Sequence, residues 1–203
     1  EFLIEFSKKL NLQKDANRLS DLKALAFWTR KQNVENLVKK SISSDERVGL
    51  GLLFHITPSN IATNFIYSLF FGLLTGNSNI IKISSKKTIQ SEIICRCLNQ
   101  ILKKKKFEKL KKRITIIRYN DNDIYTKNIS YKCNLRIIWG GDETIKAIRK
   151  FELNPSATDI TFADRSSICI INSGSIIKTN SFDLSILVEK FYNDTYLVDQ
   201  NAC

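Results

Sequence analysis

The stretch Val48-Gly-Leu-Gly-Leu-Leu-Phe-His-Ile56 decides the fold of this 203-residue chain. It is apolar almost without interruption, and it ends in the turn-forming residues Thr-Pro-Ser-Asn at 57–60. A strand without polar alternation is buried on both faces, which is typical of a parallel sheet covered by helices. We therefore expect a strand here, followed by a helix from Ile61 to Thr75 that ends at Gly76 and Asn77.

The same alternation of strand and helix recurs three more times along the chain. The apolar runs predict strands at Asn79–Ile83, Ile114–Arg118 and Leu135–Trp139, and the 3.6-residue periodicity predicts helices at Thr88–Lys106, Asn122–Ile129 and Asp142–Lys150. The pattern indicates an α/β fold with a Rossmann-like parallel sheet flanked by helices. Ligands of such sheets bind at the carboxyl ends of the strands. The positions to inspect are therefore 57–60, 82–85, 119–120 and 140–141.

Two flanking regions do not share this pattern. The helical spacing of apolar residues in 1–47 predicts helices, including one at Ala16–Val34. We expect these helices to cover a sheet edge or to carry an oligomer contact. After Pro155 we expect short extended pieces at Asp159–Phe162 and Ser167–Asn172, then a helix at Ser181–Asn193. The chain thus divides into segments 1–47, 48–158 and 159–203. Because Glu1 is not an initiator Met, we also expect residues to precede it.

The charge of the chain is strongly basic, with 32 Lys and Arg against 20 Asp and Glu, a formal net charge of +12. Nucleic acid is the partner that such a charge first suggests. However, the dense run at 103–113 lies at a predicted helix end, where cations suit the macrodipole and solvent, and few aromatics are interleaved with it. A solvated face is favoured over an anionic partner such as a carrier protein or a nucleotide phosphate. The apolar helix at 62–75 is too short to span a membrane.

The five cysteines do not indicate disulfides or a metal site. Their number is odd, none forms Cys-x-x-Cys, and Cys95 and Cys97 point to different faces of one helix. We expect Cys133 and Cys169 to pack as small hydrophobic side chains. Reduced thiols fit a cytoplasmic location.

The fifth cysteine ends the polar stretch Asp199-Gln-Asn-Ala-Cys203, which is too polar for a core strand. This pattern predicts a nucleophile that a turn brings into a cleft, with an inert core thiol as the alternative. A reactive thiol needs its pKa lowered, usually by a helix N-terminus or a cation.

Several polar residues near the strand ends allow two interpretations each. Asn60 could donate a hydrogen bond to an oxyanion, or it could cap a helix, as Ser59 also could. Lys82 could reach a nucleotide ribose or simply occupy an edge position. His55, the only histidine, is interpreted as structural, with a Cys–His pair as the alternative.

Two adjacent glycines follow the fourth predicted strand. Gly140 and Gly141 would let the backbone approach a phosphate at the start of the next helix, although a tight strand–helix turn explains them equally well. Asp142 and Glu143 would repel a phosphate placed directly over them.

Five of these segments, taken in order, resemble the aldehyde dehydrogenase superfamily, and most closely its acyl-CoA reductase branch, the LuxC-type fatty acyl reductases of bacterial luminescence. They are His55-Ile-Thr-Pro-Ser-Asn60, Phe71-Gly-Leu-Leu-Thr-Gly-Asn77, Asn79-Ile-Ile-Lys82, Ile138-Trp-Gly-Gly-Asp142 and Asp199-Gln-Asn-Ala-Cys203. The resemblance implies a dinucleotide-binding domain at 48–158 and the beginning of a catalytic domain at 159–203, truncated at the nucleophile.

The resemblance also implies roles for individual residues. Cys203 would take the acyl group as a thioester, and Asn60 would hold its oxyanion together with a backbone N–H. The implied cofactor is NADPH, whose binding residues would be Thr57, Pro58, Ser59, Lys82, Ser84, Gly140 and Gly141. The implied reaction is reduction of a fatty acyl-CoA or acyl-carrier thioester to the aldehyde. An acyl-protein synthetase and a second copy of the chain are the implied protein partners.

One departure from the superfamily supports reduction over hydrolysis. Hydrolytic aldehyde dehydrogenases carry a water-activating Glu in a Glu-Leu-Gly-Gly-Lys segment, where this chain has Thr161-Phe-Ala-Asp-Arg165. Thr161 stands in place of the Glu, and Asp164 is a candidate for a displaced carboxylate. The alternatives are a related reductase of acyl phosphates, a basic nucleic-acid-binding module, and a truncated piece that only folds.

Overall fold

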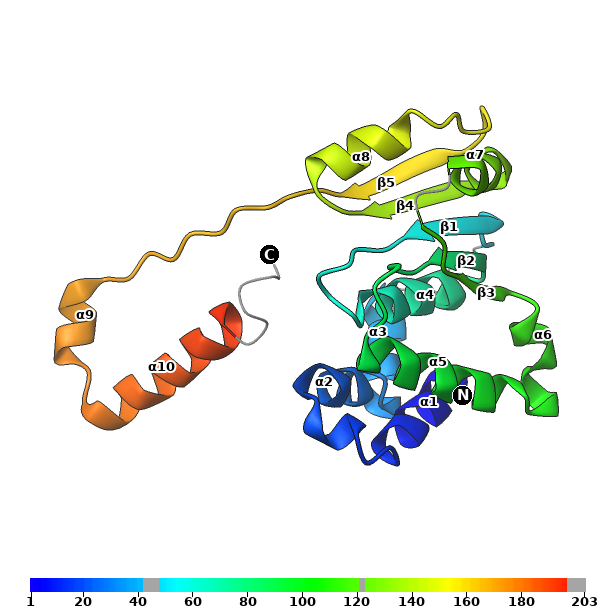
Figure 1. Cartoon of the computed structure of the whole chain (residues 1–203). Coiled ribbons are helices and arrows are strands. Elements are labelled where there is room, and N and C mark those ends of the chain that lie inside the picture. Colours follow the sequence, from blue (N-terminus) through cyan, green and yellow to red (C-terminus); the bar gives the residue numbers. More distant parts are fainter. Residues whose placement is uncertain (42–47, 121–122, 197–203) are drawn as a thin grey trace. The chain divides into compact units, whose positions relative to one another are not determined.

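A computed structural model of the chain describes residues 1–41, 48–120 and 123–196 (Figure 1). The chain divides into two compact units, the first from Glu1 to Ala163 and the second from Asp164 onward. The first unit contains the sheet and its helices, and it is described before the second.

The first unit is built on a sheet of five parallel strands in the order β3-β2-β1-β4-β5. The strands are β1 (Leu52–Ile56), β2 (Ser78–Lys82), β3 (Ile114–Ile117), β4 (Leu135–Trp139) and β5 (Thr158–Phe162). This arrangement confirms the predicted α/β fold with a Rossmann-like parallel sheet. The four strands that the apolar runs predicted are all present, and the short extended piece predicted at Asp159–Phe162 forms the fifth strand, β5.

Helices cover both faces of this sheet (Figure 1). One face is covered by α4 (Asn64–Leu74) and α5 (Ile89–Leu102), and the other by α7 (Asp123–Lys132) and α8 (Asp142–Arg149). Alternate side chains of β1 point to opposite faces of the sheet. Phe54 and Ile56 pack with Ile145 of α8 on one face, whereas His55 points to α4 on the other. Burial on both faces explains why β1 has no polar alternation.

The N-terminal helices form a further layer outside α4 and α5 (Figure 1). They are α1 (Phe2–Asn11), a short 3-10 turn at Ala16–Arg18, α2 (Ser20–Trp28) and α3 (Lys31–Ser41). The rings of Phe6 and Phe70 lie 5.2 Å apart, and those of Trp28 and Tyr67 lie 4.8 Å apart. The expectation that this segment covers a sheet edge is wrong: α4 is apolar around most of its circumference, so a second helical layer buries its outer side.

The N-terminal end of β1 differs from the sequence prediction. The strand begins at Leu52 and not at Val48, because Gly51 has a φ of 123° and leaves the extended conformation. Side-chain amides replace the ladder there: the Gly51 N–H donates to Asn77 Oδ1 at 3.1 Å and the Leu52 N–H donates to Asn134 Oδ1 at 2.8 Å.

The lysine run follows α5, which ends at Leu102 and not at Lys106. It continues through a 3-10 turn at Lys105–Phe107 and the short helix α6 (Glu108–Lys111). Lys104 pairs with Glu5 at 2.5 Å and Lys106 pairs with Glu1 at 2.5 Å. Part of the basic run thus contacts the acidic start of α1, which accounts for these two cations without a nucleic acid.

The strand β5 extends the sheet beyond residue 158, where the sequence placed a boundary. Its Asp159 accepts two hydrogen bonds from buried Arg136 of β4, at 2.7 and 3.0 Å, and the compact unit runs on to Ala163. The assignment of dinucleotide-binding and catalytic roles to the two sides of this boundary stays a prediction.

The second unit contains two helices, α9 (Ser173–Lys178) and α10 (Ser181–Thr195). The side chains of Asn172 and Asn180 cap them by accepting hydrogen bonds from Ser175 N and Asp183 N. The predicted extended piece at Ser167–Asn172 forms no strand, since no ladder partner exists for it among the described residues. The sequence predicted α10 but not α9.

Candidate functional site

The carboxyl ends of the strands lie at one edge of the sheet. In the observed register Ile56 of β1 is opposite Lys82 of β2 and Ile138 of β4, and Lys82 is opposite Ile117 of β3. The loops that follow these strands therefore begin side by side along the carboxyl edge of the sheet. Ligands of such sheets bind at this edge.

The loop after β1 is attached to β2 through Thr57. Its backbone N–H and its hydroxyl both donate to the Lys82 carbonyl, at 3.2 and 3.0 Å. The exposed Asn60 follows, but α4 begins only at Asn64 with Thr63 as its N-cap. The interpretation of Ser59 and Asn60 as helix caps is therefore wrong.

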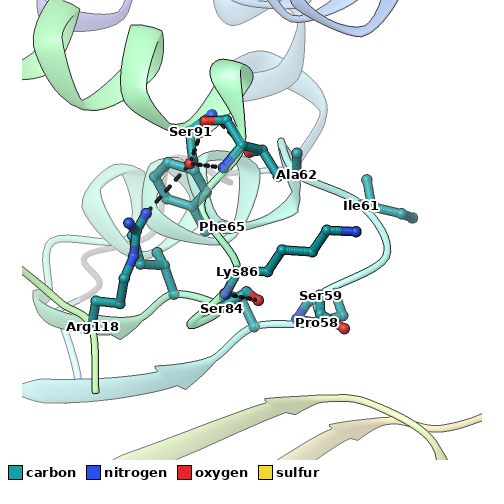
Figure 2. Close-up of a pocket in the computed structure, with 12 residues that line it drawn as sticks. Pro58, Ser59, Ile61, Ala62, Phe65, Ser84, Lys86, Ser91 and Arg118 are labelled. Carbon is teal, nitrogen blue, oxygen red and sulfur yellow. Dashed lines mark hydrogen bonds between the residues drawn. The ribbon is translucent and has the colours of Figure 1, made fainter. Parts of the chain in front are cut away.

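A pocket lies between this loop, the loop after β2 and the start of α5, as Figure 2 shows. It brings together four of the predicted site residues, Thr57, Pro58, Ser59 and Ser84. The other residues that line it are Ile61, Ala62, Phe65, Ile83, Lys86, Thr88, Ser91 and Arg118.

The remaining predicted residues lie outside this pocket. Asn60 does not line it. Lys82 places its Nζ 5.2 Å from the centre of the Tyr119 ring. Cys203 lies outside the described residues. The pocket therefore tests neither the nucleophile nor the oxyanion assignment.

The two glycines after β4 form a tight strand–helix turn. The Gly140 N–H donates to the Phe162 carbonyl at 3.2 Å, and a Cβ at Gly140 would lie 3.0 Å from Cγ2 of Thr144. Gly141 is the N-cap of α8, in an extended conformation that any residue adopts. The close contact inside the turn explains Gly140 without a ligand, and a role in binding pyrophosphate stays a prediction.

The cations of the pocket, Lys86 and Arg118, were missed by the sequence analysis. The apolar pattern predicts Arg118 as the last residue of a strand, so the positions expected to bind a ligand begin at residue 119. The strand β3 ends at Ile117, so Arg118 is already in the loop at the carboxyl edge. Lys86 lies one residue beyond the inspected range 82–85. Inspecting one more residue on each side would have found both.

His55 is a structural residue, as predicted. Its Nδ1 lies 2.7 Å from Ser68 Oγ and its Nε2 lies 2.9 Å from Asn79 Oδ1, and the ring is fully buried. Because Asn79 Oδ1 is an acceptor, Nε2 carries the proton and Ser68 donates to Nδ1. Burial lowers the pKa of His55 to about 4, only partly offset by the bond to Asn79. Both ring nitrogens are used, so neither is left for a thiol.

Three of the four described cysteines have a raised pKa, which is the opposite of what an activated nucleophile needs. Burial raises the pKa of Cys95 and Cys133 to about 11 and also raises that of Cys97. Cys169 is exposed, so the expectation that it packs as a small hydrophobic side chain is wrong. Within the described residues, no group of His, Cys, Asp and Glu side chains is arranged to hold a metal ion.

Comparison with protein families identifies the chain. The family model for acyl-CoA reductase (LuxC) matches residues 4–203. The chain belongs to the LuxC family. The match includes the undescribed stretch that ends at Cys203, and it confirms the resemblance drawn from the ordered segments. A search of curated proteins found no match to this LuxC-family chain.

Solved structures similar to this LuxC-family chain are aldehyde dehydrogenases and related proteins. PnpE from Pseudomonas sp. WBC-3 is 14% identical, with a TM-score of 0.59 over 80% of this chain and 37% of its own. A lactaldehyde dehydrogenase is 14% identical, with a TM-score of 0.58 over 79% of this chain and 38% of its own. Glyceraldehyde-3-phosphate dehydrogenase GapN from Methanocaldococcus jannaschii, solved with NADP, is 16% identical, with a TM-score of 0.58 over 79% of this chain and 40% of its own. These likenesses establish the fold, and the chain spans less than half of each structure.

In the described parts of this LuxC-family chain, no helix is both long and apolar enough to cross a bilayer.

Proposed function

We propose that this chain forms the cofactor-binding part of a reductase that uses NADPH to convert a fatty acyl thioester into the aldehyde. The acyl donor would be an acyl-CoA or an acyl group on a carrier. The observation that carries the proposal is the pocket at the carboxyl edge of the sheet, where Thr57, Pro58, Ser59 and Ser84 meet in a member of the LuxC family.

The residues of the pocket fit the adenosine end of a dinucleotide. Phe65 and Ile83 offer apolar surface, while Ser59, Ser84 and Thr88 offer hydroxyl groups at its rim. Small-molecule sites combine apolar surface with placed polar groups that fix the orientation of the ligand. Lys82, held near the Tyr119 ring, lies at the end of the adjacent strand, where it can reach a ribose.

Cys203 is the proposed nucleophile. Its thiolate attacks the carbonyl carbon of the thioester, the CoA or carrier thiolate leaves, and the acyl group is bound to Sγ. When bound, NADPH supplies the hydride for the reduction. The bond between Sγ and carbon then breaks, which releases the aldehyde and restores the thiolate of Cys203.

Asn60 is the proposed oxyanion donor. It is exposed in the loop at the carboxyl edge of the sheet, three residues before the helix cap Thr63. An amide N–H in such a loop can donate to the negative charge that develops on the carbonyl oxygen. Thr161 lies in β5, paired with Ile138, and its hydroxyl is no general base for water. This supports transfer from a thioester over hydrolysis.

The nucleophile is tested by labelling the complete protein with radioactive acyl-CoA. We expect a protein-bound label that neutral hydroxylamine removes, since hydroxylamine cleaves thioesters. Cys203→Ala should carry no label and should lose acyl-CoA-dependent oxidation of NADPH, yet should bind NADPH with unchanged affinity.

The matched control is Cys169→Ala, because Cys169 is the exposed thiol among the described residues. It should retain both label and turnover. A Cys203→Ala protein that still forms the adduct would remove the nucleophile assignment. A wild-type protein that binds NADPH but never reduces an acyl thioester would remove the proposed reaction.

The proposed setting follows from the LuxC family. We propose long-chain fatty aldehyde for luminescence as the product, an acyl-protein synthetase and a second copy of the chain as protein partners, and the cytoplasm as the location. Co-purification with a synthetase and light scattering of the complete protein would test the two partners.

A further inference from the structure

The segment between α5 and β3 is strongly basic. Residues 103–113 contain eight lysines and arginines and one acidic residue, Glu108. The sequence predicts this run at a helix end, where cations suit the macrodipole. However, α5 ends at Leu102 with Lys103 as its C-cap, and the macrodipole acts only over the last turn of a helix. The lysines that follow therefore need another explanation.

This basic segment is held to the first unit on one side. The Phe107 side chain is buried, and its ring lies 5.5 Å from the ring of Phe2. Lys104 and Lys106 form ion pairs with the acidic start of α1. The backbone of the segment thus has a defined position, and its other lysines extend from a fixed support.

Most of these other lysines have no anionic partner. Five of them, which we call the basic surface, are exposed: Lys103, Lys105, Lys109, Lys111 and Lys112. Among the described residues, Lys112 alone of the five has an ion-pair partner, Glu108 at 3.8 Å, and both side chains are largely exposed. Solvent screens such a pair, so it neutralises little of the charge.

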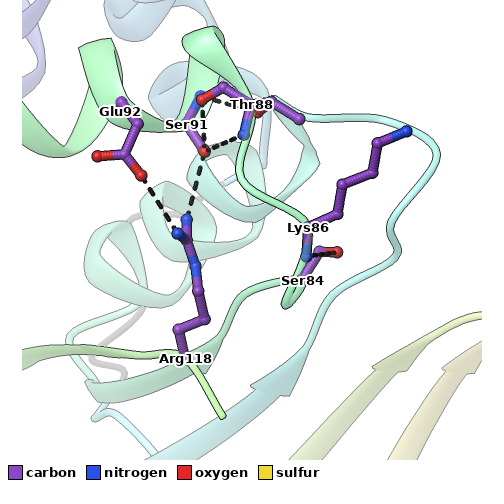
Figure 3. Close-up of polar contacts among 6 residues, drawn as sticks. All are labelled: Ser84, Lys86, Thr88, Ser91, Glu92 and Arg118. Carbon is purple, nitrogen blue, oxygen red and sulfur yellow. Dashed lines mark hydrogen bonds and ion pairs between the residues drawn. The ribbon is translucent and has the colours of Figure 1, made fainter. Parts of the chain in front are cut away.

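Arg118 shows how a cation with partners inside the chain is bound (Figure 3). Its guanidinium donates to Glu92 Oε1 at 3.2 Å and to Ser91 Oγ at 3.4 Å, and its side chain is 22% exposed. The basic surface has no comparable set of partners in the part of the chain that the structure describes. Its ammonium groups can therefore bind an external anion without breaking a buried contact.

The residues between these lysines limit the class of partner. Phe107 is buried and Leu110 is half-buried, so the segment offers a protein partner no exposed apolar anchor and a nucleic-acid strand no ring for base stacking. The helix α6 has four residues, too few for a recognition helix in a DNA groove. What remains is ammonium charge alone, which suits a plane of anionic headgroups.

The basic surface lies away from the edge where the reaction is proposed. Arg113 directly precedes β3, so the segment lies at the amino ends of the parallel strands, opposite the carboxyl edge (Figure 1). A flat partner bound there leaves the carboxyl edge uncovered. The reason for a membrane rests on the proposed function, because its long-chain aldehyde product partitions into a bilayer.

We propose that the basic surface binds the anionic headgroups of a membrane and attaches the protein reversibly to the bilayer surface. Each lysine near such a surface strengthens binding roughly fivefold. The attraction falls off within a Debye length, about 10 Å at 0.1 M salt. Attachment should therefore depend on lipid charge and on salt, and not on NADPH or an acyl substrate.

The test is co-sedimentation of the complete protein with lipid vesicles at about 0.1 M salt. Wild type should bind vesicles with roughly 30% phosphatidylserine and should not bind pure phosphatidylcholine. The triple variant Lys105→Gln, Lys109→Gln and Lys111→Gln should bind the charged vesicles roughly a hundredfold more weakly, since three contributions are lost. Arginine at the same three positions keeps the charge and should preserve binding.

The matched control removes the same charge elsewhere. Lys14, Lys23 and Lys127 are exposed and lie outside the basic segment, after α1, in α2 and in α7. Changing these three to Gln should leave binding to charged vesicles within about threefold of the wild type, because distant charges are screened. Far-UV circular dichroism shows whether each triple variant is folded.

Three outcomes would overturn the proposal: equal binding to charged and uncharged vesicles, an equal loss in the two Gln triple variants, or tighter binding to a DNA duplex than to charged vesicles at the same salt. The proposed function fails separately, because vesicle binding needs no substrate. A protein that reduces acyl-CoA but does not bind charged vesicles contradicts only the membrane contact. A protein that binds them but forms no acyl adduct contradicts only the reaction.

Discussion

The two compact units of this chain use apolar residues in opposite ways. In the first unit α4 buries Phe65, Ile66, Leu69 and Phe70 between the sheet and the N-terminal helices. In the second unit neither helix buries a single described residue, and α10 exposes large side chains. These include Phe182, Leu187, Val188, Phe191 and Tyr192.

The difference shows that helix-forming pattern and core formation are separate properties. Both α4 and α10 were predicted from the sequence, and both are helices. Only α4 lies between two layers that exclude water, so only there does burial contribute to stability, at about 25 cal/mol per Å² of apolar surface. The comparison predicts that substitutions of the same type have large effects in the first unit and small effects in the second.

The largest expected effect comes from the buried arginine that joins β4 to β5. Arg136 is 1% exposed and donates to both carboxylate oxygens of Asp159 and to the Phe151 carbonyl. Arg136→Ala removes the buried partner of Asp159, which keeps only the longer contact with the more exposed Arg149 at 3.6 Å, and should lower the free energy of unfolding by about 3–5 kcal/mol. Urea unfolding followed by far-UV circular dichroism measures it. Arg165→Ala, at an exposed position of the second unit, should change it by less than about 0.5 kcal/mol. Equal losses of unfolding free energy in the two variants would contradict the expected difference between the two units.

A leucine pair gives the apolar form of the same test. Leu69 of α4 is fully buried, whereas Leu187 of α10 is 42% exposed. Leu69→Ala should cost about 2–5 kcal/mol, because it removes buried surface and leaves a cavity. Leu187→Ala should cost less than about 1 kcal/mol in the same urea assay of this chain. A cost at Leu187 as large as that at Leu69 would show that α10 has a core of its own.

Acid should destabilise the first unit through His55. Its pKa is about 4 when folded, against an ordinary value of 6.5, so the unfolded chain binds the proton more readily. Neutral, buried His55 contributes up to about 3 kcal/mol to the free energy of unfolding. This contribution is fully present above pH 6.5 and is lost as the pH falls toward 4. The difference in unfolding free energy between wild type and His55→Gln should therefore shrink over this range. The second unit contains no histidine, so its helix signal should lack this change. A constant difference from pH 7 to 4 would show that His55 is not buried neutral.

The smallest expected effect concerns two glycines. Gly140→Ala puts a Cβ 3.0 Å from Thr144 Cγ2 and should cost about 1–2 kcal/mol, because the turn after β4 is overpacked. Gly174→Ala in α9 meets only Asn172 Oδ1, at 3.3 Å, and Ala suits a helix, so its effect should stay within about 0.5 kcal/mol. Thermal unfolding of both variants distinguishes them. A neutral Gly140→Ala would show that Thr144 moves freely, and the close-approach explanation of Gly140 would then fail.

The sequence predicted most of the first unit because the central strands of its sheet are largely buried and therefore form apolar runs. Leu135–Trp139 was predicted with both bounds correct, and Thr88 was correctly placed at the start of α5. The early part of β1 was overpredicted because apolar composition does not reveal that Gly51 adopts a positive φ. Bulk hydrophobicity also could not show that Val48 is exposed.

The candidate site was predictable only in part. The rule that ligands bind at strand carboxyl ends identified Thr57, Pro58, Ser59 and Ser84, which the pocket brings together. Arg118 was missed because the predicted strand includes Arg118, whereas β3 ends at Ile117. Lys86 was missed because it lies one residue beyond the positions 82–85 that follow the second predicted strand. The assignments of Asn60 and Cys203 rest on family resemblance, since no local pattern distinguishes a catalytic amide or thiol from an ordinary one.

The strand order β3-β2-β1-β4-β5 has a consequence for how the chain is made. On the ribosome β1 emerges first, and it is the central strand. Each later strand joins a free edge: β2 and then β3 on one side, β4 and then β5 on the other. Since domains fold from the N-terminus during synthesis, the sheet can grow outward during translation without any finished strand pair having to separate.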